Sequence, residues 1–154
     1  MFYKRPGAEQ QDSADKAVGA LPVKAEKITD IPVREYMLKW LSAFAGDMSV
    51  SDAKAFCLPR LLYQNYIWHA FSFRKTDCIY GDDAVEAAKD GIPGECFILM
   101  CDAQALYKIP DGSILTPQVT ESLGNAVVFD TKFTKTYVHT GEDGTGPFYK
   151  EAEA

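Results

Sequence analysis

The feature that most constrains this chain is the apolar run Cys96-Phe97-Ile98-Leu99-Met100-Cys101, which follows the turn dipeptide Pro93-Gly94. Successive side chains of a strand point to opposite faces, so a strand without polar alternation has both faces covered. We therefore expect residues 95–101 to form a central strand, covered on both sides or by a helix and a partner strand.

Further strands are expected on the C-terminal side of this run. Ala105 to Ile109 has the composition of a short strand and ends at the turn Pro110-Asp111-Gly112. Ala126 to Asp130 and Thr134 to Thr140 are rich in β-branched and aromatic residues. The link between them is short enough for an antiparallel hairpin. Residues 147–149 are expected to add a last segment at an edge of the sheet.

A long helix is expected to begin at Asp30, whose side chain can cap free N–H groups, and to end at Gly46. Its apolar residues recur at helical spacing: Val33, Met37, Trp40, Leu41 and Phe44. A second helix is expected to start at Ser49 or Ser51, with Pro59 as its limit.

Two shorter helices are expected over Asp83 to Lys89 and from Thr116-Pro117 to Gly124. The stretch Leu61 to Phe73 fits either a helical face or, in its aromatic-rich run Tyr66 to Phe73, an alternating strand, and we favour a strand over the second half of the stretch. The resulting order has more hairpins than parallel crossovers. It predicts an α+β domain with a mainly antiparallel sheet of about 4–5 strands and helices packed on one face.

The domain boundaries follow from length and periodicity. A chain of 154 residues fits one domain. Residues 1–29 lack periodicity, and Gly19 and Pro22 interrupt them, so we expect a flexible N-terminal tail. Residues 30–150 are then the single α+β domain.

Charge and cysteine usage restrict the partners and the compartment. The net charge of −6 argues against nucleic-acid binding and allows a basic protein partner, although solubility alone also explains it. The four cysteines form no Cys-x-x-Cys pair, and most lie in apolar runs as reduced thiols do. No signal-peptide apolar region follows the N-terminus, and no apolar run is long enough to span a membrane. We expect a cytoplasmic protein.

His69 and His139 are the only histidines, and they are the candidates for an acid–base pair or for metal ligands. No carboxylate or second ligand lies at a characteristic spacing from either, so we favour the interpretation that one is a buried, hydrogen-bonded histidine and the other an exposed one. A zinc site that used Cys78, Cys96 or Cys101 would have irregular ligand spacing. We therefore expect no metal, no cofactor and no catalytic residue.

Acidic residues form the other candidate site. Asp82, Asp83 and Glu86 lie at an expected helix start, where negative charge also complements the helix dipole. Glu142 and Asp143 lie in a glycine-rich loop and would repel phosphate. Together these residues could bind a basic partner.

Two parts of the chain are distinctive when taken together. The first is Tyr66-Ile67-Trp68-His69-Ala70-Phe71-Ser72-Phe73 followed by Cys78-Ile79-Tyr80-Gly81-Asp82-Asp83-Ala84, and the second is Val128 to Thr140 followed by Gly146-Pro147-Phe148-Tyr149. Together they resemble a bacterial family called domain of unknown function 4275. The resemblance covers about residues 61–149, departs from the family pattern at Lys135 and at Gly141-Glu142, and implies no established activity. By analogy, the small acidic form is similar in style to immunity proteins of toxin systems.

The sequence therefore predicts a non-catalytic protein-binding module, immunity-like, that occludes a basic partner surface. The acidic residues would supply the charge, and Trp68 and Tyr137 would support the sheet. The candidate binding residues as a whole are Trp68, His69, Asp82, Asp83, Glu86, Tyr137, His139, Glu142 and Asp143. One alternative is an enzyme for a small ligand, with His69 and His139 together in a cleft. The other is a structural subunit of a homo-oligomer that uses an exposed sheet edge.

Overall fold

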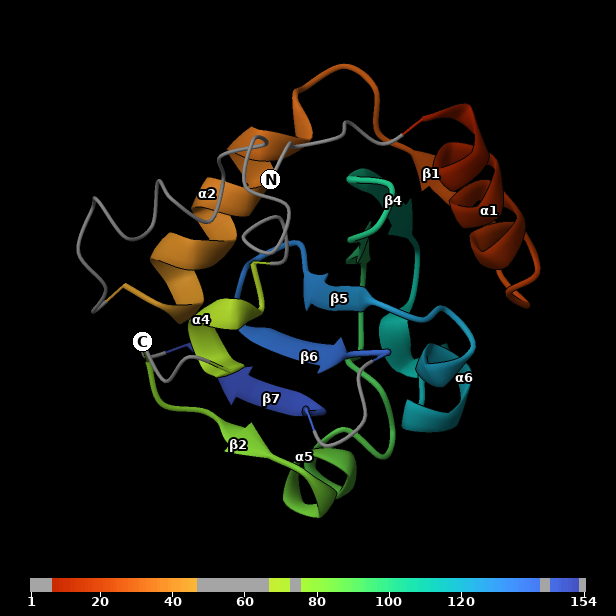
Figure 1. Cartoon of the computed structure of the whole chain (residues 1–154). Helices are drawn as coiled ribbons and strands as arrows, with labels where there is room; N and C mark the ends of the chain where they lie inside the picture. Colours follow the sequence, from red (N-terminus) through yellow and green to blue (C-terminus); the bar gives the residue numbers. More distant parts are fainter. Residues whose placement is uncertain (1–6, 47–66, 73–75, 142–144, 153–154) are drawn as a thin grey trace.

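The computed structural model describes residues 7–46, 67–72, 76–141 and 145–152 (Figure 1). One antiparallel sheet of seven strands organises these residues, in the order β1-β4-β3-β5-β6-β7-β2. The strands are β1 Glu26–Lys27, β2 Ile79–Tyr80, β3 Cys96–Met100, β4 Ala105–Ile109, β5 Ala126–Asp130, β6 Lys135–His139 and β7 Phe148–Glu151. The helices are α1 Ala8–Gly19, α2 Val33–Phe44, α4 His69–Ser72, α5 Asp82–Ala87 and α6 Pro117–Glu121, and Gly112–Ile114 forms the short 3-10 helix η2.

The apolar run forms β3, the central strand that its composition predicted. β4 and β5 flank it on both sides, and all five of its residues are buried. β5 and β6 form the expected antiparallel hairpin, in which Ala126 pairs with His139 and Val128 with Tyr137. The predicted last segment is also a strand, but β7 lies between β6 and β2 rather than at the edge.

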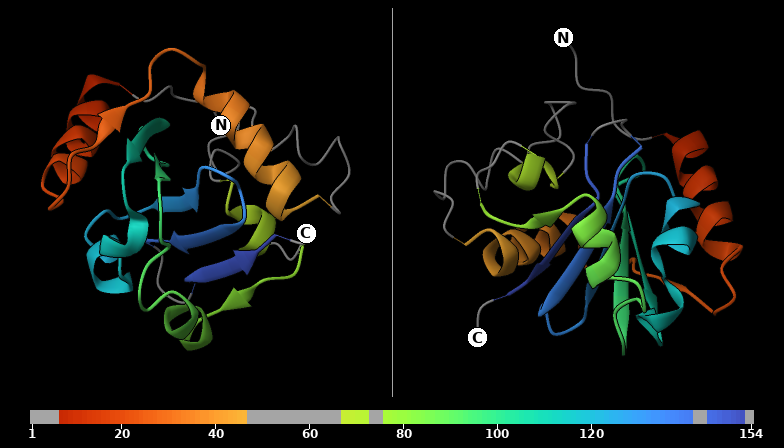
Figure 2. Two further views of the ribbon diagram at one scale, coloured as in Figure 1. Left: turned by 180° about the vertical axis from the view of Figure 1, so that it is seen from behind. Right: turned by 90° about the horizontal axis from the view of Figure 1, so that it is seen from below.

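Helices cover both faces of the sheet, which corrects the prediction that they pack on one face. Ile98 belongs to a core shared with α1, α5 and α6, whereas its neighbours Phe97 and Leu99 belong to a second core shared with α2 and α4. Figure 2 shows the sheet between these two layers. The reason is the composition of β3, because a strand that is apolar on both faces needs a cover layer on each face.

The expected count of four to five strands was too low because the two outermost strands, β1 and β2, have two residues each. Two residues carry no alternation that a sequence pattern could reveal. The antiparallel sheet and the α+β class are confirmed.

The long predicted helix is α2, and its apolar stripe is buried as expected at Met37, Trp40, Leu41 and Phe44. Its first turn differs from the prediction, since Pro32 is the N-cap and no side chain caps the helix, so Asp30 does not have that role. The second expected helix, from Ser49 or Ser51, lies outside the described residues.

The run that we favoured as a strand contains a helix instead. His69–Ser72 forms α4, whose residues Ala70 and Phe71 are buried against the sheet. The Phe71 ring lies 5.2 Å from Trp40 and 5.7 Å from Phe148, measured between ring centroids. The local pattern fitted both periods, and packing against α2 and β7 decided between them.

The N-terminal region is the largest correction. Residues 8–28 are not a flexible tail, because α1 lies on the sheet and β1 pairs with β4. Ala14, Val18 and Leu21 are buried in the same core as β3 and β5. α1 is a weakly amphipathic helix with a mostly polar surface, so its sequence lacks the strong apolar stripe that predicts a docked helix.

The two shorter helices are confirmed as α5 and α6. Thr116 caps α6 by accepting a hydrogen bond from the Val119 N–H at 3.4 Å, and Pro117 occupies the first turn. α5 begins one residue earlier than expected, at Asp82, directly after Gly81.

Candidate functional site

Two of the predicted binding residues are core residues. The Trp68 side chain is 0% exposed and stacks on Phe148, and Tyr137 is 3% exposed. They support the sheet, as expected, but they cannot also contact a partner. Their inclusion among binding residues is therefore corrected.

The two histidines belong to elements that differ in their place relative to the sheet. His139 shares a face of β6 with Tyr137, whose core is the one covered by α1, α5 and α6. α4, which begins at His69, packs on the opposite face. The His139 Nδ1 lies 2.6 Å from the Gly124 carbonyl oxygen, which only accepts, so this nitrogen carries a proton. This contact gives His139 a role in joining β6 to the end of α6.

The thiols are placed as small apolar groups. Burial raises the pKa of Cys96 to about 12 and that of Cys78 to about 11, and it also raises the pKa of the fully buried Cys101. None of these three is in a disulfide. A thiol that stays protonated is a poor nucleophile and a poor metal ligand. Within the described ranges, no three His, Cys, Asp or Glu side chains are grouped as metal ligands would be.

The predicted acidic residues of α5 lie beside exposed apolar side chains. We call this region the β2–α5 surface. Four large hydrophobic side chains are exposed in the described part of the chain, and three of them are here: Ile79 at 45%, Tyr80 at 67% and Val85 at 38%. The surface as a whole comprises Ile79, Tyr80, Asp82, Asp83, Val85 and Glu86. Aromatic and aliphatic side chains bordered by charge are typical of protein interfaces.

Local structure explains why these side chains face outward. Gly81 has φ +67°, a left-handed conformation that favours glycine, and it turns the chain directly from β2 into α5. Ala84 on α5 and Ala88, which caps the end of this helix, are buried in the core. Asp82, Val85 and Glu86 share the opposite face, because residues three and four apart lie on one side of a helix. Figure 1 shows β2 and α5 together at one end of the sheet.

The charge of this surface is negative and only partly compensated. Glu86 pairs with Lys89 at 3.1 Å, but both side chains are more than half exposed, so the pair is weak. No ion pair involves Asp82 or Asp83 among the residues that the structure describes. These carboxylates therefore remain available to a cationic partner. Glu142 and Asp143 lie outside the described residues.

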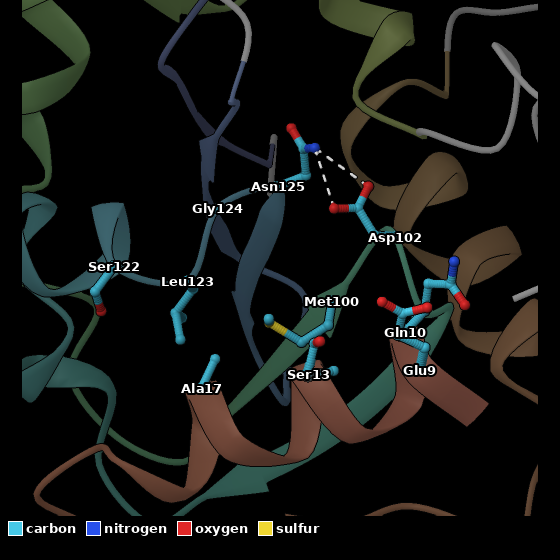
Figure 3. Close-up of a pocket in the computed structure, with 12 residues that line it drawn as sticks. Glu9, Gln10, Ser13, Ala17, Met100, Asp102, Ser122, Leu123, Gly124 and Asn125 are labelled. Atoms are coloured by element: carbon cyan, nitrogen blue, oxygen red, sulfur yellow. Dashed lines mark hydrogen bonds between the residues drawn. The ribbon is translucent and has the colours of Figure 1, made fainter. Parts of the chain in front are cut away.

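A pocket of about 440 Å³ lies between α1, the end of α6 and the turn from β3 to β4 (Figure 3). Met100 and Leu123 give it an apolar floor, and Glu9 and Asp102 supply carboxylates. Asn125 donates a hydrogen bond to Asp102 at 3.2 Å. Among the described residues that line it, no serine hydroxyl forms a hydrogen bond with a carboxylate or a histidine. The sequence could not reveal this pocket because α1 forms one of its walls.

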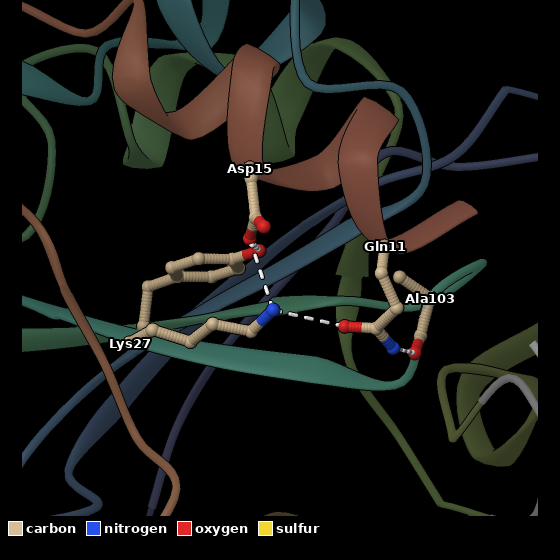
Figure 4. Close-up of polar contacts among 5 residues, drawn as sticks. Gln11, Asp15, Lys27 and Ala103 are labelled. Atoms are coloured by element: carbon tan, nitrogen blue, oxygen red, sulfur yellow. Dashed lines mark hydrogen bonds and ion pairs between the residues drawn. The ribbon is translucent and has the colours of Figure 1, made fainter. Parts of the chain in front are cut away.

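Polar contacts attach α1 and β1 to β4 (Figure 4). Asp15 accepts a hydrogen bond from the Tyr107 hydroxyl at 2.5 Å and pairs with Lys27 at 3.1 Å. Lys27 also donates to the Gln11 side chain, which in turn donates to the Ala103 carbonyl oxygen. The pKa of Asp15 is lowered, mainly by the hydrogen bond from Tyr107 and to a smaller extent by Lys27. The pKa of Tyr107 is raised, mainly by burial and to a smaller extent by Asp15. This group has a structural role.

The model of one protein family, "Domain of unknown function (DUF4275)", matches residues 16–149 of the chain. The chain belongs to this family. The match begins within α1 and ends in β7, so the DUF4275 region includes the end of α1, the other described helices and the β2–α5 surface. The resemblance found in the sequence began only at about residue 61.

Comparisons with curated proteins and with solved structures found no match to the chain. Membership of DUF4275 therefore establishes kinship without an activity. In the described segments of this DUF4275 chain, no helix has the length and apolar character needed to cross a membrane.

Proposed function

We propose that this protein is a non-catalytic, cytoplasmic protein-binding module whose β2–α5 surface binds a basic partner. The observation that carries the proposal is the exposure of Tyr80 and Ile79 directly beside Asp82 and Asp83. Aromatic side chains are frequent anchors of binding energy, and bordering charges steer association and select partners.

The net charge supports the same partner chemistry. At −6, the whole chain attracts a cationic protein over a longer range than the carboxylates of one surface could. We further propose an immunity-like action, in which the module covers the basic surface of a bacterial toxin enzyme and so blocks its substrate. Occlusion of this kind requires no catalytic group in the module.

Capture of partners from an extract of the native host tests the proposal. The tagged wild-type chain is compared with Asp82→Asn/Asp83→Asn/Glu86→Gln, at low and at high salt. We expect the wild type to retain a basic protein at low salt and the triple variant to lose it. Opposite charges near a surface are screened by salt, so high salt should weaken retention.

The matched control removes the same charge from other exposed positions. Asp12→Asn/Glu35→Gln/Glu121→Gln changes residues on α1, α2 and α6. It should retain the partner as the wild type does. Equal loss in both triple variants would attribute binding to net charge alone and would contradict a specific β2–α5 surface. If the captured protein is an enzyme, the wild type should inhibit it and the β2–α5 variant should not.

A further inference from the structure

The two edges of the sheet differ in chemistry. β1 forms one edge, and its two residues, Glu26 and Lys27, are charged and exposed. Lys27 is tied to Asp15, and Glu26 lies 3.9 Å from Lys108. Charged side chains on a short edge strand are a common protection against pairing with another chain. The other edge, β2, carries Ile79 and Tyr80 instead and lacks this protection.

The alternation of hydrogen-bonded and non-bonded positions along β2 shows which of its backbone groups face away from β7. The Gly81 N–H donates to the Pro147 carbonyl oxygen at 2.9 Å. In an antiparallel pair, hydrogen-bonded positions alternate, so Ile79 is bonded to Tyr149 and the intervening Tyr80 is not bonded to β7. The Tyr80 N–H and C=O therefore point away from the sheet. Within the described ranges, no other group forms a hydrogen bond with them.

We propose that an extended, basic segment of the protein partner pairs with β2 and extends the sheet by one strand. This inference rests on the proposed function and specifies how the β2–α5 surface is used. The outward backbone groups of Tyr80 would hold the segment, as in other cases of strand addition. Asp82, Asp83 and Glu86, at the end of β2, would attract its cationic side chains.

The same charges argue against a second copy of this chain as the added strand. Pairing β2 with β2 would bring two sets of these carboxylates close together, and like charges across an interface oppose binding. A basic segment has the complementary charge. Its alternate side chains could also contact Ile79 on one face and Tyr80 on the other, because neighbouring strand residues point to opposite faces.

A peptide of alternating lysine and valine, with blocked ends, serves as the probe. It is added to the full ¹⁵N-labelled chain, and amide chemical shifts and hydrogen exchange are recorded. We expect shifts in β2 and α5 and an exchange rate of the Tyr80 amide that is lower by about tenfold at saturation. A peptide of alternating glutamate and valine should cause neither change.

Two substitutions separate the backbone of Tyr80 from its side chain. Tyr80→Ala removes the ring and keeps the N–H, whereas Tyr80→Pro removes both and leaves the bonds of Ile79 and Gly81 to β7 intact. Proline is tolerated on an edge strand where its nitrogen faces solvent. We expect Tyr80→Pro to bind the lysine peptide about tenfold more weakly than Tyr80→Ala.

The outcomes distinguish the two proposals. If the lysine peptide shifts α5 without protecting the Tyr80 amide, or if both variants bind it equally, strand addition is overturned while charge-based binding stands. Absence of any shift on the β2–α5 surface would count against both. Protection of the wild-type amide remains decisive even if Tyr80→Pro fails to fold.

Discussion

The Trp40 indole N–H is a polar group enclosed by the core between α2 and the sheet. It donates to the Thr136 hydroxyl at 2.9 Å, and that hydroxyl donates to the Val128 carbonyl oxygen at 2.8 Å. Trp40 and Thr136 are both 0% exposed. A buried donor without an acceptor is costly, so a single hydroxyl on β6 allows a tryptophan to fill this position.

We therefore expect Thr136→Val to lower the free energy of unfolding by about 1–3 kcal/mol, because the indole N–H would lose its acceptor. Urea denaturation measures the change. In a Trp40→Phe background no indole N–H remains to be stranded, and the same substitution should cost clearly less. Equal costs in the two backgrounds would show that the Trp40–Thr136 contact does not matter for stability.

Two glycines near α5 provide a second test at this scale. Gly91 and Gly94 both have positive φ, at +71° and +88°, and alanine is disfavoured by about 1–2 kcal/mol in such a conformation. A Cβ at Gly91 would also lie 2.4 Å from the Gly112 carbonyl oxygen, whereas nothing lies within 4 Å of a Cβ at Gly94. Thermal or urea unfolding should show Gly91→Ala to be worse than Gly94→Ala by about 1–3 kcal/mol. An equal loss of stability in the two variants would mean that the cost comes from the backbone conformation alone and not from the close contact at Gly91.

At the scale of elements, α1 depends on its neighbours more than on its own sequence. Ala14 and Val18 are buried against the sheet, and Asp15, which faces Tyr107 and Lys27, lies between them in the chain. Most helices of this length are marginal in isolation and are stabilised by packing. The polar contacts select the position at which α1 lies on β4.

The contact of Asp15 should make stability depend on pH. In the folded chain the pKa of Asp15 lies below its ordinary value of 3.8. The ionised Asp15 therefore adds to the free energy of unfolding at pH values above 3.8, and this stabilisation is lost as the pH falls through the lowered pKa of the folded chain. Between about pH 5 and about pH 2, the wild type should lose more stability than Asp15→Asn. Urea denaturation across this range measures the difference.

Asp12→Asn is the matched control for this experiment, since Asp12 is an exposed carboxylate on the same helix. It should retain the pH dependence of the wild type. If Asp15→Asn and the wild type have parallel stability curves, the contact with Tyr107 contributes nothing to docking of α1.

At the scale of the whole molecule, the sheet separates two cores, and none of the described helices contributes buried residues to both. One core contains β3 residues such as Ile98 and is covered by α1, α5 and α6, and the other contains Phe97 and is covered by α2 and α4. Removal of either cover layer would expose a whole face of the sheet. Stability is therefore distributed over the molecule rather than confined to the β5–β6 hairpin.

Removal of residues 1–29 tests this view and the earlier expectation of a tail. The truncation deletes α1 and β1 and exposes Ile98, Met100 and Tyr107 on one face. Loss of the buried Val18 and Leu21 alone should reduce the free energy of unfolding by more than about 2 kcal/mol. Urea denaturation of the truncated and full chains compares them. Unchanged stability would mean that these residues are dispensable, as a flexible tail would be.

The candidate site was partly visible in the sequence. Asp82, Asp83 and Glu86 follow a glycine at a helix start, which is a local pattern, and the structure leaves them exposed. Tyr80 and Ile79 could not be recognised, because nothing in two residues shows that their strand lies at an edge. Trp68 was misjudged for the related reason that burial depends on which helix covers which face.

Sequence alone determined the elements whose signal comes from near neighbours. The all-apolar β3, the stripe of α2, the hairpin of β5 and β6, and the Thr116 cap of α6 each depend on residues a few positions apart. Only the tertiary structure decided that α1 docks, that His69 begins a helix, and that β2 is an outer strand. Those outcomes depend on contacts between segments far apart in the chain, and such contacts leave no period in the local sequence.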